Sequence, residues 1–588
     1  MNIACLDLST LPAVLQELGH NVLTLAPNPA AAPGTVLNML ALLRAKNFKS
    51  DLILQAEHLG RRIFLEGLEE FDCPKIFWAI DSHLNMHWHH YYARLFTAVL
   101  TPHLSLWQKL PPAWQHPLVR QMTRYGQDMP FRPHAERLHN FCLVGVLNEH
   151  RPLRRNLCAL LQKRWPVEVR QNIPFGEMMQ LYASSRIVPN EAIAFEVNYR
   201  LMEGASCGAV VLTPDIGEDQ NALFEPGKEI VLYSHAAHLL EEAERLLAEP
   251  KRAEAIGYAA WQRVQAEHLP VHRARFILDL AAALRLAKEP EETTGSARPQ
   301  STAPIACEAA PKNAPTTLLP PPVNLWLSQV QARRSGTLGL TGPCPPLPSQ
   351  TALFQYPEVA TFTLRLFLEN NRPDKALELL NQELLAGCHA TDLELNLTAS
   401  FGGLKLQNFN LAKQFLYRQL KNSNLSFTPP SNGLELCLLW AKLLAQKNLA
   451  HQPGFLFDIN SHLPSCVLEV LLQAENRFNA QLQANNNLML ELLQLALQAF
   501  APSKAACFLH MGYAARLCLL KPEDWRAQLE YGLLCLICCR LEEGLFELEQ
   551  AALKAKLKHE EKNFTRLLRP HDINGCLQQN LTSLLEPS

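Results

Sequence analysis

The chain has 588 residues, of which 48% are hydrophobic and 19% are charged, and its formal net charge is -2. That length exceeds a single hydrophobic core and indicates two to four domains. The balanced charge excludes a general electrostatic attraction to nucleic acid or anionic membranes. The amino terminus lacks the basic segment of a signal peptide, and no run of about 18 apolar residues occurs. We therefore expect a cytoplasmic protein without a membrane span, whose 16 cysteines stay reduced.

Strand-like and helix-like segments alternate over the first 130 residues, and the helical ones include Leu11–Leu18 and Val36–Arg44. Such β-α-β alternation predicts a parallel sheet covered by helices, here a Rossmann-like domain over residues 1–130. Residues 81–92 directly follow the fourth strand, and residues just past strand carboxyl ends are those that can face a ligand. The expected strands are Ile3–Leu6, Val22–Ala26, Leu52–Gln55, Ile76–Ile80 and Ala98–Thr101.

Asp81 and the histidines that follow it are the candidate reactive groups of this domain. Asp81 is suited either to cap the next helix or to act as the catalytic base that takes a proton from an acceptor hydroxyl. His83 and His87 would share a helix face and could bind a metal, but aromatic residues surround them and no carboxylate-rich outer shell is visible. We therefore predict no metal site, and expect these histidines to line an acceptor pocket or a partly buried polar wall.

A second α/β domain is expected over residues 131–286, after a segment with two prolines and a glycine at Tyr125–Pro133. The loop after its first strand carries Arg151, Arg154 and Arg155, which offer fixed positive charge. Residues 236–285 have the composition of helices, and the last helix is expected to cross back over the first domain. The expected strands are Phe141–Leu147, Val167–Arg170, Arg186–Val188, Ala209–Thr213 and Glu229–Tyr233.

The segment before strand Ala209–Thr213 has helical composition and ends at Cys207-Gly208, where glycine supplies a left-handed cap. Arg200 and Glu203 are three residues apart and share a face of this helix. If the amino end of the helix points toward a ligand, Arg200 could pair with a diphosphate and Glu203 could accept hydrogen bonds from ribose hydroxyls. The alternative is a solvated pair on a surface helix.

Two sequence blocks in this region resemble the donor-side signature of GT-B glycosyltransferases, in particular the CgeB-type (spore-maturation protein) family. The patterns are N-x-R-x-x-E-x-x-x-C-G before a buried strand and F-x-P-G-x-E-x-x-x-Y after it. They fall here on Asn198, Arg200, Glu203, Cys207 and Gly208, and on Phe224, Pro226, Gly227, Glu229 and Tyr233.

The resemblance implies a nucleotide-sugar donor held in the second domain by Asn198, Arg200, Glu203, Gly208 and Arg151. It also implies transfer without a metal or other cofactor, since such enzymes generally neutralise diphosphate with helix amino ends and basic side chains. The sequence departs from the common retaining pattern of two glutamates eight positions apart, because Glu196 lies seven positions before Glu203. That departure puts the full retaining motif in doubt.

Residues 287–350 contain twelve of the 41 prolines, and this composition predicts a flexible linker. Within it, Val323–Arg334 is an amphipathic segment that either packs on one of the domains or forms a surface turn of helix.

Residues 351–588 are leucine-rich and predict an all-α domain. Ala376 and Ala412 occupy matching places in two related segments, 36 residues apart, which is close to the length of a tetratricopeptide repeat. Gly532, Gly544 and Ala551 have the small-residue spacing that lets paired helices approach closely. We expect a tetratricopeptide-like array, with a non-repetitive helical bundle as the alternative.

Together these features predict a cytoplasmic GT-B glycosyltransferase with a helical domain that recruits a protein acceptor or partner. The acceptor would bind the first domain and the nucleotide-sugar the second. A non-catalytic scaffold or adaptor, in which the GT-B half only binds and the helices carry the function, is the rival from another class.

Overall fold

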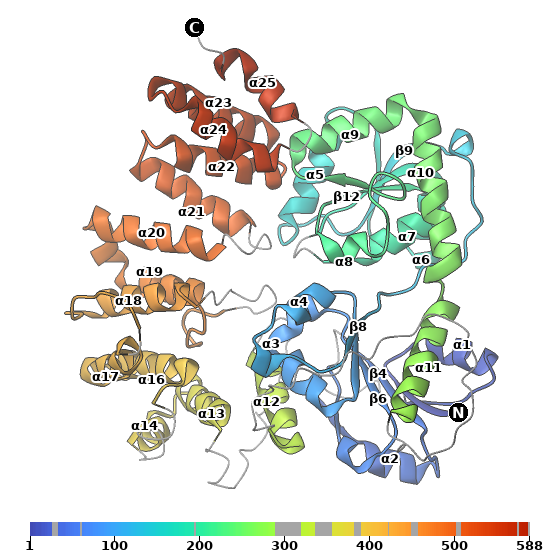
Figure 1. Ribbon diagram of the computed structural model, residues 1–588, viewed down its shortest axis with the longest axis horizontal. Helices are drawn as coiled ribbons and strands as arrows, with labels where there is room; N and C mark the ends of the chain where they lie inside the picture. Colours follow the sequence, from blue (N-terminus) through green and yellow to red (C-terminus); the bar gives the residue numbers. More distant parts are fainter. Residues whose placement is uncertain are drawn as a thin grey trace, which may run out of the picture. The chain divides into compact units, whose positions relative to one another are not determined.

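The computed structural model describes residues 1–25, 33–58, 62–192, 196–287, 319–334, 356–381, 390–421, 423–447, 457–500, 507–572 and 575–585 (Figure 1). The chain divides into two compact units, Met1–Gly126 with Glu267–Pro348, and Gln127–Ala266 with Ser349–Ser588. Within the described residues no helix combines the length and the apolar character needed to cross a membrane.

The first unit contains a six-stranded, all-parallel sheet in the order β2-β1-β4-β6-β7-β8. Its central strands are buried on both faces, as parallel sheets covered by helices require. The five predicted strands are confirmed to within two residues at each end, except that Ala26 lies outside the described residues. The strands are β1 (Asn2–Leu6), β2 (Asn21–Leu25), β4 (Leu52–Ala56), β6 (Lys75–Trp78), β7 (Ala98–Thr101) and β8 (Val119–Gln121).

One segment of the first unit differs from the prediction. The stretch Val36–Arg44 was expected to be helical throughout, but Val36–Asn38 forms strand β3, which pairs in parallel with β5 (Phe64–Glu66). Helix α2 (Met39–Ala45) begins only afterwards, because the Asn38 side chain accepts a hydrogen bond from the backbone N–H of Ala41 at 2.8 Å and caps it.

Helix α11 (Pro270–Leu286) belongs to the first unit, although it follows the second sheet in the chain. Ala274, Ile277 and Ala281 are fully buried and share a core with Ile3 and Leu15. This confirms that the helix crosses back over the first domain.

The second unit begins with a five-stranded parallel sheet in the order β10-β9-β11-β12-β13. The predicted strands are all present, although β9 starts and ends earlier than expected and β13 is shorter. Their bounds are β9 (His139–Val144), β10 (Val167–Arg170), β11 (Ser185–Pro189), β12 (Val210–Pro214) and β13 (Val231–Tyr233). The helices that accompany them are α5 (Pro152–Gln162), α6 (Phe175–Ala183), α7 (Tyr199–Ser206), α8 (Glu218–Asn221), α9 (Ala236–Ala248) and α10 (Pro250–Arg263).

Most of the predicted linker, residues 287–350, lies outside the described residues. Its described part is helix α12 (Pro321–Arg334), which packs against α3 (Ser82–Tyr92) in the first unit. Ala332 is buried in the core of that unit, and its carbonyl oxygen accepts a hydrogen bond from Arg62 Nη1 at 2.6 Å. Of the two alternatives for this segment, packing on a domain is therefore correct.

The helical region consists of consecutive helices that pack on their neighbours in the chain. Gly532 and Gly544 confirm the predicted close approach, because a Cβ atom at Gly532 would lie 3.1 Å from the Gly544 carbonyl oxygen. The kinship with tetratricopeptide repeats stays a prediction. The helices are α13 (Pro357–Glu369), α14 (Pro373–Asn381), α16 (Leu393–Lys405), α17 (Phe409–Leu420), α18 (Gly433–Ala445), α19 (Val467–Gln483), α20 (Asn486–Phe500), α21 (Cys507–Leu520), α22 (Trp525–Ile537), α23 (Leu541–Leu557), α24 (Glu561–Leu568) and α25 (Cys576–Leu585).

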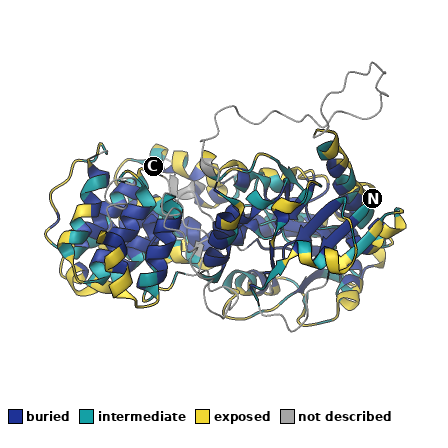
Figure 2. Cartoon of the chain, turned by 90° about the horizontal axis from the view of Figure 1, so that it is seen from below, coloured by how far each residue is buried: buried dark blue, intermediate teal, exposed yellow. Residues whose placement is uncertain are grey.

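Two separate cores organise these helices. Helices α13 to α21 pack around one large cluster of leucine, alanine and aromatic side chains, whose inner faces are buried in Figure 2. Helix α22 contributes Ala527 and Leu534 to that cluster as well, and α22 to α25 share a second core with the second sheet and with α5 and α9, in which Trp525, Leu548 and Phe564 are fully buried. The last four helices are thus an integral part of the structure around the second sheet.

Candidate functional site

The carboxyl edge of the second sheet is the place where a ligand is expected. The chain passes from β9 outward to β10 and then returns to β11 on the other side of β9, so the direction of winding reverses between β9 and β11. In open α/β sheets ligands bind outside the strand carboxyl ends at such a reversal. Gly145 follows β9 there, and Asn190 and Glu191 follow β11.

Glu191 is the central charged group at this edge. Its carboxylate accepts from Arg200 Nη1 at 2.7 Å and from Arg154 Nε at 2.5 Å, and the glutamate side chain is 1% exposed. Burial by itself lowers the pKa of the Arg200 guanidinium. The negative charge of Glu191, and after it Tyr182, raise that pKa by more than burial lowers it, so the net pKa lies above the usual value. Two guanidinium groups around one carboxylate leave one net positive charge held in a fixed position.

Asn190 joins this ion-pair network to the neighbouring strands. Its side-chain oxygen accepts from Arg200 Nη1 and from Asn198 Nδ2, each at 3.0 Å, and its amide nitrogen donates to Thr213 Oγ1 at 3.1 Å. The Tyr233 hydroxyl donates to the Asn190 carbonyl at 2.7 Å. The structure thus brings the predicted residues Asn198 and Arg200 together and gives Tyr233, the last residue of the second sequence block, a positioning role.

Gly145 lets the arginines approach the end of β9. A Cβ atom there would lie 2.5 Å from Arg154 Nη1 and 3.2 Å from Arg200 Nη2, and the residue has a φ of +153°. Arg200 Nη2 also donates to the Val144 carbonyl at 3.1 Å, which fixes the guanidinium over the strand end. Any larger residue at this position would displace the arginines.

Glu203 lies one turn after Arg200 on α7 and is half-buried. Burial raises the pKa of its carboxyl to about 7, and the Arg200 charge opposes that shift. No ion pair joins Glu203 to Arg200, both of which the structure describes, because the arginine is engaged with Glu191. The expected shared helix face is confirmed, but the solvated surface pair is not, since Arg200 is buried.

Gly208 and Arg151 lie apart from that network. Gly208 has a φ of +66° and ends α7 in a Schellman turn, in which Ala209 N–H donates to the Gly204 carbonyl at 3.2 Å. It precedes β12 and so lies at the amino end of that strand, where a Cβ atom would meet Phe131 at 2.6 Å. Arg151 is exposed at the start of α5.

The carboxyl edge of the first sheet carries a second polar cluster. Glu57 follows β4, and its carboxylate accepts from the backbone N–H of Asp81 at 2.7 Å and from Asn85 Nδ2 at 2.5 Å. His89 Nε2 lies 3.1 Å from the same carboxylate, and both side chains are buried. Burial raises the pKa of Glu57, but His89 and the hydrogen bonds outweigh it, so the pKa is lowered. Asp81, the predicted base, is half-buried at the start of α3.

The histidines after Asp81 form a buried polar wall, which was one of the two expected arrangements. The ring of His83 lies tilted against that of His103, which follows β7, with ring centroids 4.6 Å apart. Burial lowers the pKa of His83 to about 3, so its ring is neutral near neutral pH. His87, His89 and His90 are buried as well.

Three important residues were absent from the sequence-based assignment: Asn190, Glu191 and Glu57. Each directly follows a parallel strand, so the rule that ligands lie past strand carboxyl ends could have found them. Glu191 was missed because it lies before the matched pattern, which begins at Asn198. Only the fold brings Glu191 within hydrogen-bonding distance of Arg200.

Comparison with known proteins gives one family match and several distant structural likenesses. Residues 124–279 match the family described as "Glycosyl transferase-like". Sucrose-phosphate synthase from Thermosynechococcus elongatus is 13% identical, with a TM-score of 0.34, over 49% of this chain and 100% of that one. A glycosyltransferase from Rickettsia africae is 12% identical, with a TM-score of 0.36, over 49% and 99% of the two chains.

Anabaena HepE, solved in complex with UDP-glucose, is 12% identical with a TM-score of 0.34, over 48% of this chain and 100% of its own. No curated protein matches the sequence. TM-scores this low leave the fold to be judged from the sheets themselves. Two parallel Rossmann-type sheets and the matched segment that begins just before the second one agree with the predicted fold class. The chain therefore has a GT-B-like α/β region with two parallel Rossmann-type sheets, part of which matches the glycosyltransferase-like family, followed by an all-helical region.

Proposed function

We propose that the protein is a glycosyltransferase that moves a sugar from a nucleotide-sugar donor to an acceptor hydroxyl. The observation that carries this proposal is the Arg154–Glu191–Arg200 network at the reversal point of the second sheet, within the glycosyltransferase-like segment. In the reaction the bond between the sugar and the diphosphate breaks, a bond from the acceptor oxygen to the sugar forms, and the acceptor proton passes to a base.

The net positive charge of the network is suited to a departing diphosphate. Because Arg200 is held by Glu191, Asn190 and the Val144 carbonyl, its charge is already in place and needs no reorganisation when negative charge develops. The amino end of α7, whose dipole favours negative charge, begins at Tyr199 directly before Arg200 and adds to the positive field. Fixed charge of this kind supports transfer without a catalytic metal.

Glu203 has the properties of a ribose-binding group. Its half-buried carboxyl has a pKa of about 7 and can therefore accept or donate a hydrogen bond near neutral pH. A sugar hydroxyl offers both a donor and an acceptor. Gly208, by contrast, has contacts typical of a turn residue, and we assign it to the support of α7 and β12.

The acceptor would bind at the carboxyl edge of the first sheet, with Asp81 as the base. Glu57 accepts from the backbone N–H of Asp81 and so fixes the start of α3, which positions the Asp81 carboxylate. The neutral rings of His83 and His103, which contact each other, supply uncharged hydrogen-bonding groups, which suit a polyhydroxylated acceptor.

We also propose that the helical region recruits a protein acceptor. Phe546, Leu553 and Leu557 on α23 are 56%, 39% and 82% exposed. Their spacing of seven and four residues places them on one face of the helix. An apolar stripe on the solvent side of a packed helix is a feature of surfaces that bind another protein.

The test is a thermal-shift and transfer assay with a panel of UDP-, GDP- and ADP-sugars, followed by variants with the preferred donor. Glu203→Gln and Arg200→Lys should weaken nucleotide binding about 10- to 100-fold, as the loss of a charge-assisted hydrogen bond requires. Glu177→Gln and Arg155→Ala remove exposed charges near the same elements and serve as matched controls.

The rival adaptor function predicts a different result. A protein that binds a nucleotide-sugar but neither transfers nor hydrolyses it would be a binding module. Unchanged donor affinity in both Glu203→Gln and Arg200→Lys would contradict the proposed donor site. Transfer by the folded, chelator-treated protein that requires added Mg²⁺ or Mn²⁺ would contradict the metal-independent mechanism.

A further inference from the structure

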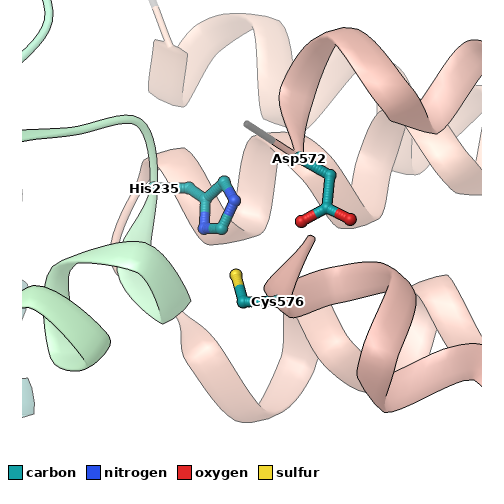
Figure 3. A group of neighbouring side chains, drawn as sticks. All are labelled: His235, Asp572 and Cys576. Atoms are coloured by element: carbon teal, nitrogen blue, oxygen red, sulfur yellow. The ribbon is translucent and has the colours of Figure 1, made fainter. Parts of the chain in front are cut away.

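His235, Asp572 and Cys576 form a compact group of potential metal ligands where the last helix meets the second sheet. One ligand atom from each residue lies within 4.8 Å of the others, and no other such group of three occurs among the described residues. Figure 3 shows the imidazole reaching across from the segment before α9 toward the carboxylate and the thiol at the start of α25. His235 and Asp572 are 3% and 7% exposed.

The ligand-bearing side chains are already oriented by other hydrogen bonds. His235 Nδ1 accepts from the His238 backbone N–H at 3.2 Å. The two Asp572 carboxylate oxygens accept from the backbone N–H groups of Leu577 and Gln578, each at 2.8 Å. Each oxygen keeps a second lone pair. Asp572 is thus fixed by an outer layer of hydrogen bonds of the kind that a metal site requires, whereas the bond from His238 to His235 Nδ1 has to break if Nε2 binds a metal.

One buried atom in the group is left unsatisfied. His235 Nε2 is enclosed and has no hydrogen bond of good geometry among the described residues, but the ring has a hydrogen bond with the His571 backbone that raises the pKa of His235. An orphaned buried nitrogen is costly, and a bound ion would satisfy it. The capping contacts explain Asp572 and His235 Nδ1, and the Cys576 thiol is hydrogen-bonded to the Asp572 side chain, so that Nε2 is the one atom of the group without a well-formed partner among the described residues.

The protonation states are compatible with metal binding. Burial, and then the His238 charge, lowers the pKa of His235 to about 4, so the ring is neutral, as a ligand must be. Burial, and then the Asp572 charge, raises the pKa of the Cys576 thiol to about 12. The thiol is therefore protonated without a metal, and a dication between these groups would reverse that preference.

We propose that His235 Nε2, an Asp572 carboxylate oxygen and Cys576 Sγ bind a divalent ion of the zinc type, which holds α25 on α9. One nitrogen, one oxygen and one sulfur ligand fit the preferences of Zn²⁺, with water in the fourth position. On binding, the thiol proton is released to solvent and the imidazole proton moves from Nε2 to Nδ1, so that His238 N–H loses its acceptor. The ion is structural here and takes no part in sugar transfer.

The location explains what such an ion would do. Leu577 and Leu581, on the same helix as Cys576, are buried in the core that α22 to α25 share with the second sheet. A three-way link from α9 to the first turn of α25 would hold this short terminal helix in place. The sequence predicted no metal site, because positions 235 and 572 are far apart and neither belongs to a spaced ligand motif.

The experiment uses the full-length protein, stripped with a chelator and dialysed. Zn²⁺ is titrated against a competing chromophoric chelator, and Co²⁺ replaces it for absorption spectra. We expect one Zn²⁺ per chain and a thiolate-to-cobalt charge-transfer band. Zinc should also raise the thermal midpoint and slow amide hydrogen exchange in α25. Cys576→Ala and His235→Asn, of which the second keeps a helix-capping acceptor, should weaken binding by at least about 100-fold, since loss of an outer partner alone costs 10- to 100-fold.

Cys518→Ser is the matched control, because it removes another half-buried thiol of the helical region outside the group and should leave affinity unchanged. Circular dichroism of the metal-free variants checks that they fold, and the cobalt spectrum of the unaltered protein tests thiolate ligation without any substitution. Absence of zinc binding, absence of the charge-transfer band, or wild-type affinity in Cys576→Ala would overturn the site. Binding without slower exchange in α25 would overturn its role in holding that helix.

Discussion

Arg200 and Glu191 form a buried ion pair, with Arg200 Nη1 2.7 Å from Glu191 Oε2, at the point where the second sheet reverses its winding. Arg154 binds the other oxygen of the same carboxylate at 2.5 Å. The arginine that the sequence pattern marks is therefore held by a glutamate that the pattern does not include. A ligand at this edge would therefore interact with the Arg200 charge together with the charges of Glu191 and Arg154.

Replacing Glu191 should destabilise the protein strongly. Glu191→Ala would leave the buried Arg200 guanidinium without its counter-charge, and breaking a buried pair in this way costs about 3–5 kcal/mol. The free energy of unfolding in urea is the measurement, with Glu177→Ala, which removes an exposed glutamate from α6, as the control. Equal stability of the two variants would mean that the ion pair contributes little.

Glu203 should make stability depend on pH near neutrality. Its pKa is about 7 in the folded protein against an ordinary 4.5. Between these pH values the folded chain holds a proton that the unfolded chain has released. The contribution of Glu203 to the free energy of unfolding should therefore be most favourable below about pH 4.5. It should fall as the pH rises and level off above about pH 7.

At about 1.4 kcal/mol per pH unit the full effect is roughly 3 kcal/mol, an upper value because the half-buried side chain is partly screened by solvent. Glu203→Gln abolishes the titration, so the variant should gain stability over the wild type between pH 5 and pH 8. Urea unfolding at these pH values measures the difference, and Glu177→Gln should show no such gain. A pH-independent difference for Glu203→Gln would show that its carboxyl titrates normally.

Asp81→Asn tests the proposed catalytic base. The substitution keeps the size of the side chain and its suitability for the start of α3, but it cannot take a proton. We expect kcat to fall about 10²- to 10⁴-fold, while donor affinity stays unchanged. Steady-state kinetics and nucleotide binding are the two readouts, and Asp72→Asn, at an exposed aspartate of the same unit, is the control. An unaltered kcat would leave Asp81 with only a structural position.

Trp525 should be a major contributor to the packing of the last helices on the second sheet. It is fully buried and lies against Phe564, with ring centroids 5.8 Å apart. Trp525→Ala should cost about 3–5 kcal/mol, as expected for a large aromatic in a core. Phe546→Ala, at an exposed aromatic on the neighbouring helix, should stay within about 0.5 kcal/mol of the wild type. Thermal or urea unfolding distinguishes the two, and similar small losses would contradict the shared core.

The shared core also decides where the chain can be cut. A fragment ending at residue 286 loses α22 to α25 and exposes the apolar faces of α5 and α9, so it should have a lower thermal midpoint and bind a hydrophobic dye. Deletion of residues 351–520 keeps those four helices and should preserve nucleotide binding. It should also preserve modification of a protein acceptor, because the exposed stripe on α23 that we propose recruits the acceptor remains. A fully stable 1–286 fragment would show that the helices pack there without contributing stability.

The sequence by itself determined the strands of the two sheets except β8, and it indicated that both sheets are parallel. Alternating β-branched and leucine-rich segments define strands such as β10 and β12, and Gly208 marks the end of α7 because few other residues accept its φ of +66°. Three of the signature residues, Asn198, Arg200 and Tyr233, meet around Asn190 in the structure, while their role in donor binding stays a prediction. These signals are local, because the backbone preference of a short segment depends mainly on the residues of that segment.

Only the tertiary structure decided which groups meet. Glu191 as the partner of Arg200, Glu57 beneath Asp81, and the joining of His235 to Asp572 and Cys576 all depend on how separate elements pack. The same holds for α22 to α25, whose leucine pattern reports that one face is buried but not whether a helix or a sheet covers it. Hydrophobic burial is non-directional, so periodicity fixes the face of an element while its neighbour is chosen by the fold as a whole.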